Sequence, residues 1–179
     1  MHADIADVIA DTALNSIEAG SSLVELRLEE SAETIAVEIS DNGKGMDEKT
    51  LGRVFDPFFT EAGKHDRRRV GLGLPILKQM CEALGGNVEI ESAPGKGTRL
   101  RYSFSARHID LPPMGDISKA VLQLMSYPGD FEFRLLRRKG DGGYEISRSE
   151  LVEAVGPLES VDALQMAREF LASQEEELG

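Results

Sequence analysis

The amino-acid sequence predicts an α+β fold, with a second and smaller α+β part at its C-terminal end. Three observations support this prediction. Apolar residues recur at helical spacing from Ile5 to Ala19. Two stretches, 23–40 and 87–105, each contain two alternating segments separated by a polar or glycine-rich turn, which is the signature of a β-hairpin. After residue 115, helical and alternating patterns occur again.

The composition is typical of a globular protein, and the net charge excludes some classes of binding partner. With 179 residues, the chain can form one domain with an appendage or two small domains. The net charge of -12 argues against binding to nucleic acids and to anionic membrane surfaces. The single cysteine, Cys81, excludes an intramolecular disulfide. Because the sequence shows neither an apolar run of about 20 residues nor a signal peptide, we expect a cytoplasmic protein.

The first expected helix runs from Ile5 to Ala19, and Gly20 is a natural stop. It carries Asp11 and Asn15, which lie four residues apart and therefore on the same helix face. They could be an ordinary solvent-facing pair. Alternatively, the carboxylate orients a water or hydroxyl group, and the amide oxygen holds a hard cation such as Mg²⁺.

The first hairpin leads into a loop that contains one carboxylate and two glycines, Asp41-Asn42-Gly43-Lys44-Gly45-Met46. A carboxylate at the end of a strand can accept a hydrogen bond from a ligand, and glycines allow close approach of the backbone. The same residues are also typical of a simple turn. Asp47 is expected to cap a short helix that ends near Val54.

A dense aromatic segment follows at residues 55–60, Phe-Asp-Pro-Phe-Phe-Thr. We expect it to pack in the core and to anchor the stretch after it. Residues 61–69 have no apolar periodicity and end in the basic run Arg67-Arg68-Arg69. This run is either part of a solvated loop or a group of cations that closes over a polyphosphate.

Gly71-Leu72-Gly73-Leu74-Pro75 is expected to open a helix that reaches about Leu84. Proline favours the first turn of a helix, and the free N–H groups of a helix N-terminus attract anions. Gly85 and Gly86 end this helix. The second hairpin then turns through residues 93–98, Ala-Pro-Gly-Lys-Gly-Thr.

Residues 107–115 contain two prolines and a glycine and are interpreted as a linker between parts 1–106 and 116–179. The second part is expected to contain a helix, two strands joined by the turn at residues 140–143, and two final helices. Its length of about 65 residues suits either a small α+β module or an extension packed on the first domain.

The order of these motifs is more specific than any one of them. It is Asp11 and Asn15 on a helix, Asp-x-Gly-x-Gly from Asp41, the aromatic segment 55–60, Gly-x-Gly from Gly71, and Gly-x-Gly-Thr ending at Thr98. Over residues 1–106 this order resembles the ATP-binding domain of the gyrase, heat-shock chaperone, histidine kinase and mismatch-repair superfamily, called GHKL or the Bergerat fold. The resemblance implies a two-layer α+β sandwich, with a mixed sheet and helices on one face, that binds ATP and Mg²⁺.

The resemblance also implies roles for individual residues. Asn15 would coordinate Mg²⁺, and Asp11 stands where ATP-hydrolysing members carry a glutamate general base. Asp41 would accept the exocyclic amine of adenine, in a pocket shaped by Gly43 and Gly45. Further cofactor-binding positions would be Met46, Phe55, Gly71, Leu72, Gly73, Leu74 and Thr98, and Arg69 would contact the phosphates.

Within the superfamily, the aromatic segment and Gly71-Leu72-Gly73-Leu74 look most like sensor histidine kinases. A phosphoacceptor histidine is the part that the sequence does not supply. His108 precedes Pro113 at the spacing of an acceptor box, but Ile109 replaces the expected acid and Pro112 prevents the required helix. Because the chain begins directly at the first helix, we expect a stand-alone kinase or ATPase component, with the phosphoacceptor or regulated target on a separate protein that residues 116–179 contact.

Two alternative functions remain open at this point. One is a nucleotide-sensing binding module without significant turnover, in which ATP changes an interaction surface. The other is a serine kinase resembling bacterial anti-sigma factors, although these usually lack the aromatic segment and a tail of this length.

Overall fold

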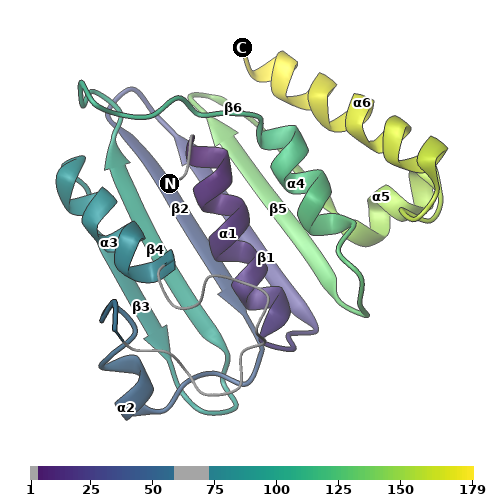
Figure 1. Ribbon diagram of the computed structural model, residues 1–179. Helices are drawn as coiled ribbons and strands as arrows, with labels where there is room; N and C mark the ends of the chain where they lie inside the picture. Colours follow the sequence, from purple (N-terminus) through teal and green to yellow (C-terminus); the bar gives the residue numbers. More distant parts are fainter. Residues whose placement is uncertain (1–3, 59–72) are drawn as a thin grey trace.

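The structure is a computed structural model that describes residues 4–58 and 73–179 (Figure 1). The helices and strands in chain order are α1 Ile5–Glu18, β1 Leu23–Glu30, β2 Thr34–Asp41, α2 Glu48–Leu51, α3 Gly73–Ala83, β3 Val88–Ser92, β4 Thr98–Ser105, α4 Ile117–Met125, β5 Glu132–Lys139, β6 Gly142–Ser147, α5 Arg148–Val155 and α6 Val161–Leu178.

Local sequence signals account for the first helix. The side chain of Asp4 caps α1 by accepting a hydrogen bond from the backbone N–H of Asp7 at 2.9 Å. The apolar positions that predicted the helix, including Ile5, Ile9 and Ala13, are fully or almost fully buried. The opposite face, which carries Asp11, is exposed, so the helix packs by one stripe.

The six strands form one mixed sheet in the order β3-β4-β2-β1-β5-β6. β1 pairs with β5 in parallel, and every other neighbouring pair is antiparallel. Along β1, Val24, Leu26 and Leu28 are buried, whereas Glu25 and Arg27 between them are exposed. β1 therefore has one face toward the core and one toward solvent.

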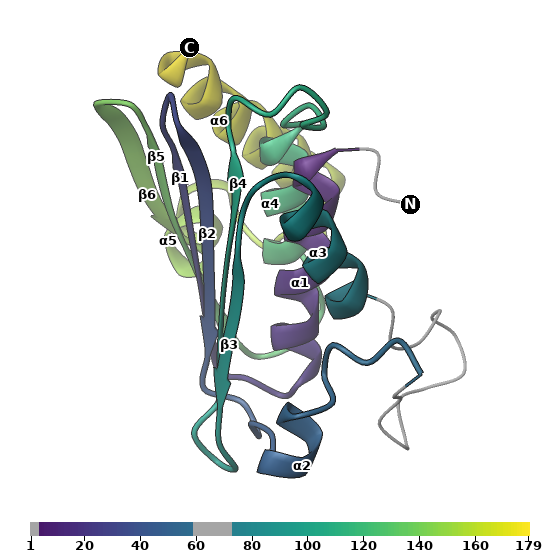
Figure 2. The same ribbon diagram turned by 90° about the vertical axis from the view of Figure 1, so that its left-hand side faces the viewer.

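Figure 2 shows the sheet edge-on, with α1, α3 and α4 packed along one of its faces and α6 on the same side. α4 lies between α1 and α6 and contacts both. This arrangement confirms the predicted two-layer α+β sandwich with a mixed sheet and helices on one face.

The elements after residue 115 continue the same sheet and core. β5 lies beside β1 over its full length, with Leu23 opposite Glu132 and Glu30 opposite Lys139. The hydrophobic core runs without interruption from α1 to α6. The C-terminal helices and strands thus extend the first part, which was one of the two arrangements left open above.

A buried cation ties the C-terminal helix to the sheet. Arg137 on β5 is 1% exposed, and its guanidinium group donates to Glu30 on β1 at 2.6 Å and to Glu175 on α6 at 3.3 Å. The hydroxyl of Tyr144 on β6 donates to the same Glu175 carboxylate at 2.7 Å. Because a buried charge is tolerated only when it is paired, this network fixes α6 at one position on the sheet.

The aromatic segment differs from the expected core packing. Phe58 is 92% exposed, and Phe55 is partly buried with Lys78 Nζ 5.5 Å from its ring centroid. Phe59 and Thr60 lie outside the described residues. Alternation and aromatic content could not show this, because a segment of six residues is too short for a periodicity that assigns a buried face.

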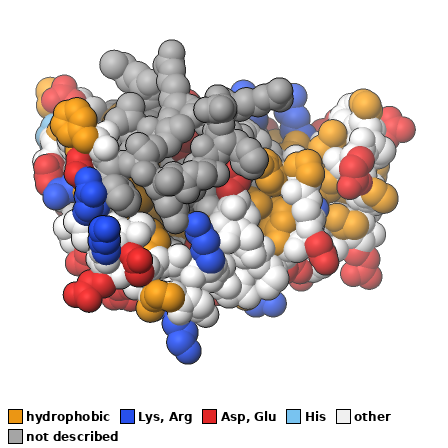
Figure 3. Space-filling model, turned by 60° about the horizontal axis from the view of Figure 1, so that its bottom comes forward, with side chains coloured by type: hydrophobic (Ala, Val, Ile, Leu, Met, Phe, Trp, Pro, Cys, Tyr) orange, Lys and Arg blue, Asp and Glu red, His pale blue; other side chains and the backbone are white. Residues whose placement is uncertain are grey.

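The charges on the surface are mixed. Figure 3 shows acidic and basic side chains interspersed over much of one face, with hydrophobic and acidic side chains gathered on its right-hand part.

Among the residues that the structure describes, no helix combines the length and apolar character needed to cross a membrane.

We expect a pH effect from the cap of α4. Hydrogen bonds from Ser118 Oγ and Lys119 N lower the pKa of Asp116 below its ordinary value of 3.8. A carboxyl group whose folded pKa is lowered stabilises the fold above its unfolded pKa and loses this effect as the pH falls through the folded value. The stability difference between wild type and Asp116→Asn should therefore shrink as the pH falls from about 5 through the ordinary pKa of 3.8 and below it. Urea denaturation of both proteins measures it, and a constant difference would contradict the assignment.

Candidate functional site

The Asp41 loop lies where β2 ends and β4 begins, because Asp41 and Thr98 are paired in the sheet register. Asp41 is partly buried, and its Oδ1 atom accepts hydrogen bonds from the backbone N–H of Gly43 at 2.9 Å and of Thr98 at 3.3 Å. Within the described residues, Oδ2 accepts no hydrogen bond from the protein. One carboxylate oxygen is thus used to hold the side chain in place, and the other remains for a ligand.

Glycines make the close packing of this loop against the β3–β4 turn feasible. Gly45 has φ +66°, and a Cβ atom there would lie 1.9 Å from the carbonyl oxygen of Ala93. Gly97 has φ +78°, and a Cβ atom there would lie 1.8 Å from the carbonyl oxygen of Asp41. Larger residues cannot occupy either position without a backbone shift. The Asp41 loop and the β3–β4 turn are therefore in close contact at two points, and this contact fixes the position of Asp41.

Gly43 has a more local reason to be glycine. A Cβ atom there would approach Ser21 Oγ at 2.6 Å and Asp41 Oδ1 at 3.0 Å. Asn42 lies between Asp41 and Gly43 in the sequence. Its side-chain oxygen accepts hydrogen bonds from the backbone N–H groups of Ser22 and Leu23 at 2.9 and 3.0 Å. Asn42 thus fastens the loop to the start of β1, whereas Asp41 faces the β3–β4 turn.

Ser92 belongs to this cluster, and the sequence reasoning missed it. Its hydroxyl donates to the carbonyl of Gly97 at 2.8 Å, accepts the backbone N–H of Met46 at 2.9 Å, and lies 2.9 Å from Thr98 Oγ1. Ser92 is the last residue of β3 and is paired with Thr98. The sequence did contain a signal for Ser92. It is a small residue with a hydroxyl group, and it ends one strand of a hairpin opposite a threonine.

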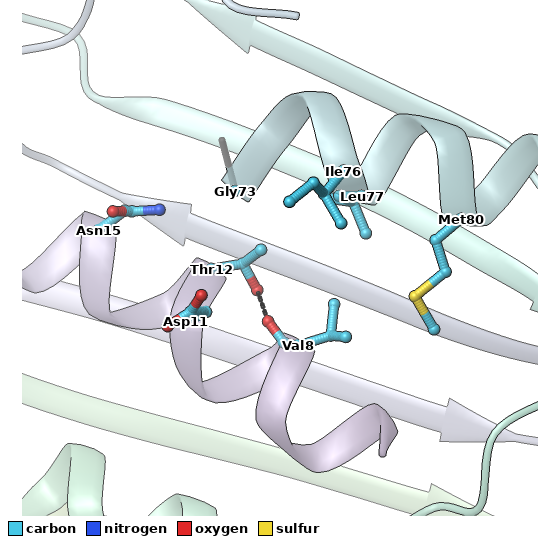
Figure 4. Close-up of a pocket in the computed structure, with 8 residues that line it drawn as sticks. All are labelled: Val8, Asp11, Thr12, Asn15, Gly73, Ile76, Leu77 and Met80. Atoms are coloured by element: carbon cyan, nitrogen blue, oxygen red, sulfur yellow. Dashed lines mark hydrogen bonds between the residues drawn. The ribbon is translucent and has the colours of Figure 1, made fainter. Parts of the chain in front are cut away.

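A second group of polar residues lies between α1 and α3 (Figure 4). Asp11 and Asn15 are exposed on α1, on the side where this helix faces Gly73 at the start of α3. The pocket between the two helices is lined by Val8, Asp11, Thr12, Asn15, Gly73, Ile76, Leu77 and Met80. Its lining combines apolar side chains with the carboxylate of Asp11 and the amide of Asn15, which are the two groups that the sequence singled out.

The start of α3 agrees with the expected helix, with Pro75 in its first turn. A Cβ atom at Gly73 would have no atom of the described residues within 4 Å. Leu74 is partly buried against the core. Arg69, Gly71 and Leu72, which were assigned to the phosphate side of the site, lie outside the described residues.

His108 lies at the other end of β4 from the Asp41 loop. It occupies a turn after the strand, and its Nδ1 atom accepts the backbone N–H of Asp110 at 3.2 Å. β4 runs from Thr98 to Ser105, which corresponds to roughly 24 Å of extended strand. The helix that would present an acceptor ring is absent around His108, as the prolines predicted.

The chemistry of these groups fits a magnesium nucleotide. A carboxylate oxygen that accepts no hydrogen bond from residues 4–58 and 73–179 suits an exocyclic amine. A hard cation such as Mg²⁺ is bound by oxygen atoms, commonly one or two from the protein and the rest from phosphates and water. Asn15 supplies such an oxygen on an exposed face, and Asp11 supplies another one turn away.

Comparisons with known proteins identify the family of the chain. A family model described as "Histidine kinase-, DNA gyrase B-, and HSP90-like ATPase" matches residues 2–108. The chain is similar to the sensor histidine kinase YxdK of Bacillus subtilis, with 35% identity over 85 residues, which is 47% of this chain and 26% of that protein. It is also similar to the sensor histidine kinase WalK of the same species, with 30% identity over 100 residues, which is 55% of this chain and 16% of that protein.

One solved structure extends the likeness beyond the matched residues. The "N terminal domain of a DNA repair protein" has a TM-score of 0.57 and 14% identity, and it covers 90% of this chain and 58% of its own. At this identity the likeness concerns the fold, and it reaches past residue 108 into the C-terminal part. The chain spans about a quarter or less of the two sensor kinases. Because the family model matches more than half of the sequence, the chain belongs to the histidine kinase-, DNA gyrase B- and HSP90-like ATPases.

Proposed function

We propose that this protein binds ATP with Mg²⁺ in a histidine-kinase-like site and directs the γ-phosphate to an acceptor on another protein. The observation that carries the proposal is the Asp41 carboxylate, which is fixed through Oδ1 and whose Oδ2 accepts no hydrogen bond from the described residues. In the fold of this ATPase family, that geometry suits recognition of adenine. Adenine presents one exocyclic amine, and Oδ2 accepts a hydrogen bond from it.

On the phosphate side, Asn15 would hold the metal and Asp11 would orient the attacking group. Mg²⁺, when bound, neutralises charge on the phosphate oxygens, and catalysis in phosphoryl transfer is mostly positioning and charge neutralisation. Asp11 is one methylene shorter than the glutamate that hydrolytic relatives carry at this position. A shorter reach toward water favours transfer to a partner over hydrolysis in this proposal.

The position of His108 supports an acceptor outside this chain. Asp41 lies at one end of β4 and His108 beyond the other end, roughly 24 Å of strand away. Direct transfer needs the reacting atoms to be about 3 Å apart. His108 would have to cross most of the length of the sheet to reach a phosphate held near Asn15.

The first test is the thermal stability of the protein with ATP and MgCl₂. A ligand at 100 times its Kd stabilises the folded state by about 2.7 kcal/mol. For a protein of this size each kcal/mol raises Tm by about 2–4 °C. We therefore expect Tm to rise by about 5–10 °C at saturating ATP and Mg²⁺, and GTP at the same concentration should raise it less. A Tm that responds to neither ATP nor ADP would refute nucleotide binding.

Turnover separates the kinase proposal from the sensing module. Release or transfer of γ-phosphate from labelled ATP, measured alone and with candidate partner proteins, is expected to exceed that of a sample without the protein. If ATP binds and no turnover occurs with any partner, the nucleotide-sensing function replaces the kinase function. A phosphorylated serine on the partner, identified by mass spectrometry, would favour the serine-kinase alternative.

A further inference from the structure

A buried hydrogen bond links α1 to β4 beside the pocket between α1 and α3. Tyr102 Oη and Thr12 Oγ1 are 3.1 Å apart, and the two residues are 3% and 5% exposed. Thr12 follows Asp11 directly and precedes Asn15 by three residues. The hydrogen bond therefore attaches to the turn of α1 that carries Asp11 and Asn15, whose side chains line the pocket.

The direction of this bond follows from the partners of Thr12. Its hydroxyl lies 2.8 Å from the carbonyl of Val8, to which it donates its single hydrogen (Figure 4). The Thr12 oxygen must then accept from Tyr102. Burial raises the pKa of Tyr102, so its hydroxyl stays protonated and donates at any physiological pH.

The strand that carries Tyr102 also holds the adenine side of the site. Thr98 at the start of β4 donates its backbone N–H to Asp41, and Tyr102 follows four residues later on the same strand. Four residues of strand correspond to about 13 Å, and alternate residues point to the same face. β4 thus fixes Asp41 at one point and the Asn15 helix at another.

We propose that Tyr102 is a positioning residue that sets the rotation and the axial position of α1, and through them the distance between Asp41 and Asn15. The inference rests on the proposed binding of ATP and Mg²⁺. The N-terminal end of α1 is held by the backbone N–H groups of Ile5 and Ala6, which donate to carbonyl groups of residues 113 and 114. Further along the helix, buried apolar residues such as Ile9 and Ala13 pack with little directional preference. A hydrogen bond depends steeply on distance and angle, so it selects one placement of the helix among similar apolar packings.

The placement matters because one nucleotide must reach both ends of the site. An adenine held by Asp41 and a metal held by Asn15 are joined by a sugar and phosphates of limited length. A shift of about 1 Å at one end can reduce catalysis by about two orders of magnitude in a well-positioned site. Replacing Tyr102 is therefore expected to disturb the distance between the adenine side of the site at Asp41 and the metal side at Asn15. The contact between Asp41 and adenine itself should stay unchanged.

The test compares four variants by the gain in ATP affinity that Mg²⁺ provides, defined as the Kd of ATP in EDTA divided by its Kd in MgCl₂. Tyr102→Phe removes the donor and keeps the ring, and Thr12→Val removes the acceptor at nearly constant volume. The double variant Thr12→Val with Tyr102→Phe removes both hydroxyls and leaves no buried polar group unpaired. Thr12→Ser keeps the hydroxyl and is the matched control.

We expect Tyr102→Phe to lower the Mg²⁺ gain at least threefold, while the Kd of ATP in EDTA stays within about twofold of wild type. Thr12→Ser should keep the wild-type gain. The double variant should recover much of the Tm that Thr12→Val loses, yet keep the low Mg²⁺ gain. This combination distinguishes positioning from stability, because stability and gain then move independently.

Two results would overturn the inference while leaving the proposed function intact. One is a wild-type Mg²⁺ gain in Tyr102→Phe. The other is a double variant whose Mg²⁺ gain returns together with its Tm, which would show that the pair only stabilises the core. Failure of the wild type to bind any adenine nucleotide is a different result, and it would refute the proposed function and this inference with it.

Discussion

Asp41→Asn is expected to weaken the binding of adenine nucleotides at least tenfold. The substituted amide keeps an oxygen that can accept the backbone N–H groups of Gly43 and Thr98, so the loop retains its anchoring bonds. The amide NH₂ group then occupies the place of Oδ2. It presents a donor to the exocyclic amine of adenine, which is also a donor, and it removes the charge that strengthens the bond. Calorimetric titration with ADP measures the Kd.

The matched control for this substitution is Asp47→Asn. Asp47 directly follows this loop, accepts the backbone N–H of Thr50 at 2.7 Å, and is exposed. Its replacement also removes one negative charge and keeps the capping oxygen, but it leaves Asp41 untouched. We expect a Kd for ADP within about twofold of wild type. Equal affinities for the Asp41 variant and wild type would mean that adenine is recognised elsewhere.

Asn15→Ala is expected to reduce phosphate transfer or release by at least 100-fold, while ADP binding in EDTA stays close to wild type. The amide oxygen of Asn15 is the proposed protein ligand of Mg²⁺, and Ala removes it without a substitute. Asn15 is exposed, and Ala has the higher helix propensity, so α1 should not lose stability. Single-turnover measurements with labelled ATP test the transfer step.

Asp7→Ala is a suitable control for this second prediction. Asp7 is an exposed polar residue of α1, about two turns from Asn15, and it is not among the residues that line the pocket between α1 and α3. Its removal should change turnover by less than about twofold. Full turnover in Asn15→Ala would show that the metal is held by other groups and would remove Asn15 from the site.

The two predictions address different ends of one site, and their combination is informative. Asp41 should control the affinity for nucleotides in the presence or absence of metal. Asn15 should control only what depends on Mg²⁺. If the two residues act independently, the loss of ATP affinity in the double variant should be close to the product of the single losses. A clear departure from that product would show that the ends are coupled, as the role proposed for Tyr102 requires.

Several features of the fold could be predicted from the sequence because their causes are local. The helical spacing of Ile5, Ile9 and Ala13 predicted α1, and the alternation in residues 23–40 predicted the first hairpin. Asp47 was expected to cap α2, and its side chain accepts the N–H of Thr50. In each of these cases the deciding contacts join residues that are close in sequence, so a short stretch contains the whole signal.

The candidate site was only partly predictable. Asp11 and Asn15 could be placed together because they lie one turn apart on a helix. The sequence order of motifs also brought Asp41 and Thr98 into one hypothesis, and the structure joins them by a hydrogen bond. Ser92 was not found, because its three partners come from two loops and the first residue of β4. Whether these partners meet depends on the register of β3 and β4.

The sequence by itself therefore determined the elements, the motif order and the chemical nature of the groups at the site. The tertiary structure decided what those groups contact. It paired β5 with β1, so that β5 and β6 continue the sheet and residues 117–178 share its core. It also placed the Tyr102 hydroxyl beside Thr12. Such contacts join residues about 90 or more positions apart and leave no periodic trace in the sequence. These contacts depend on how whole helices and strands pack against each other. That packing forms only when the chain buries its shared hydrophobic core.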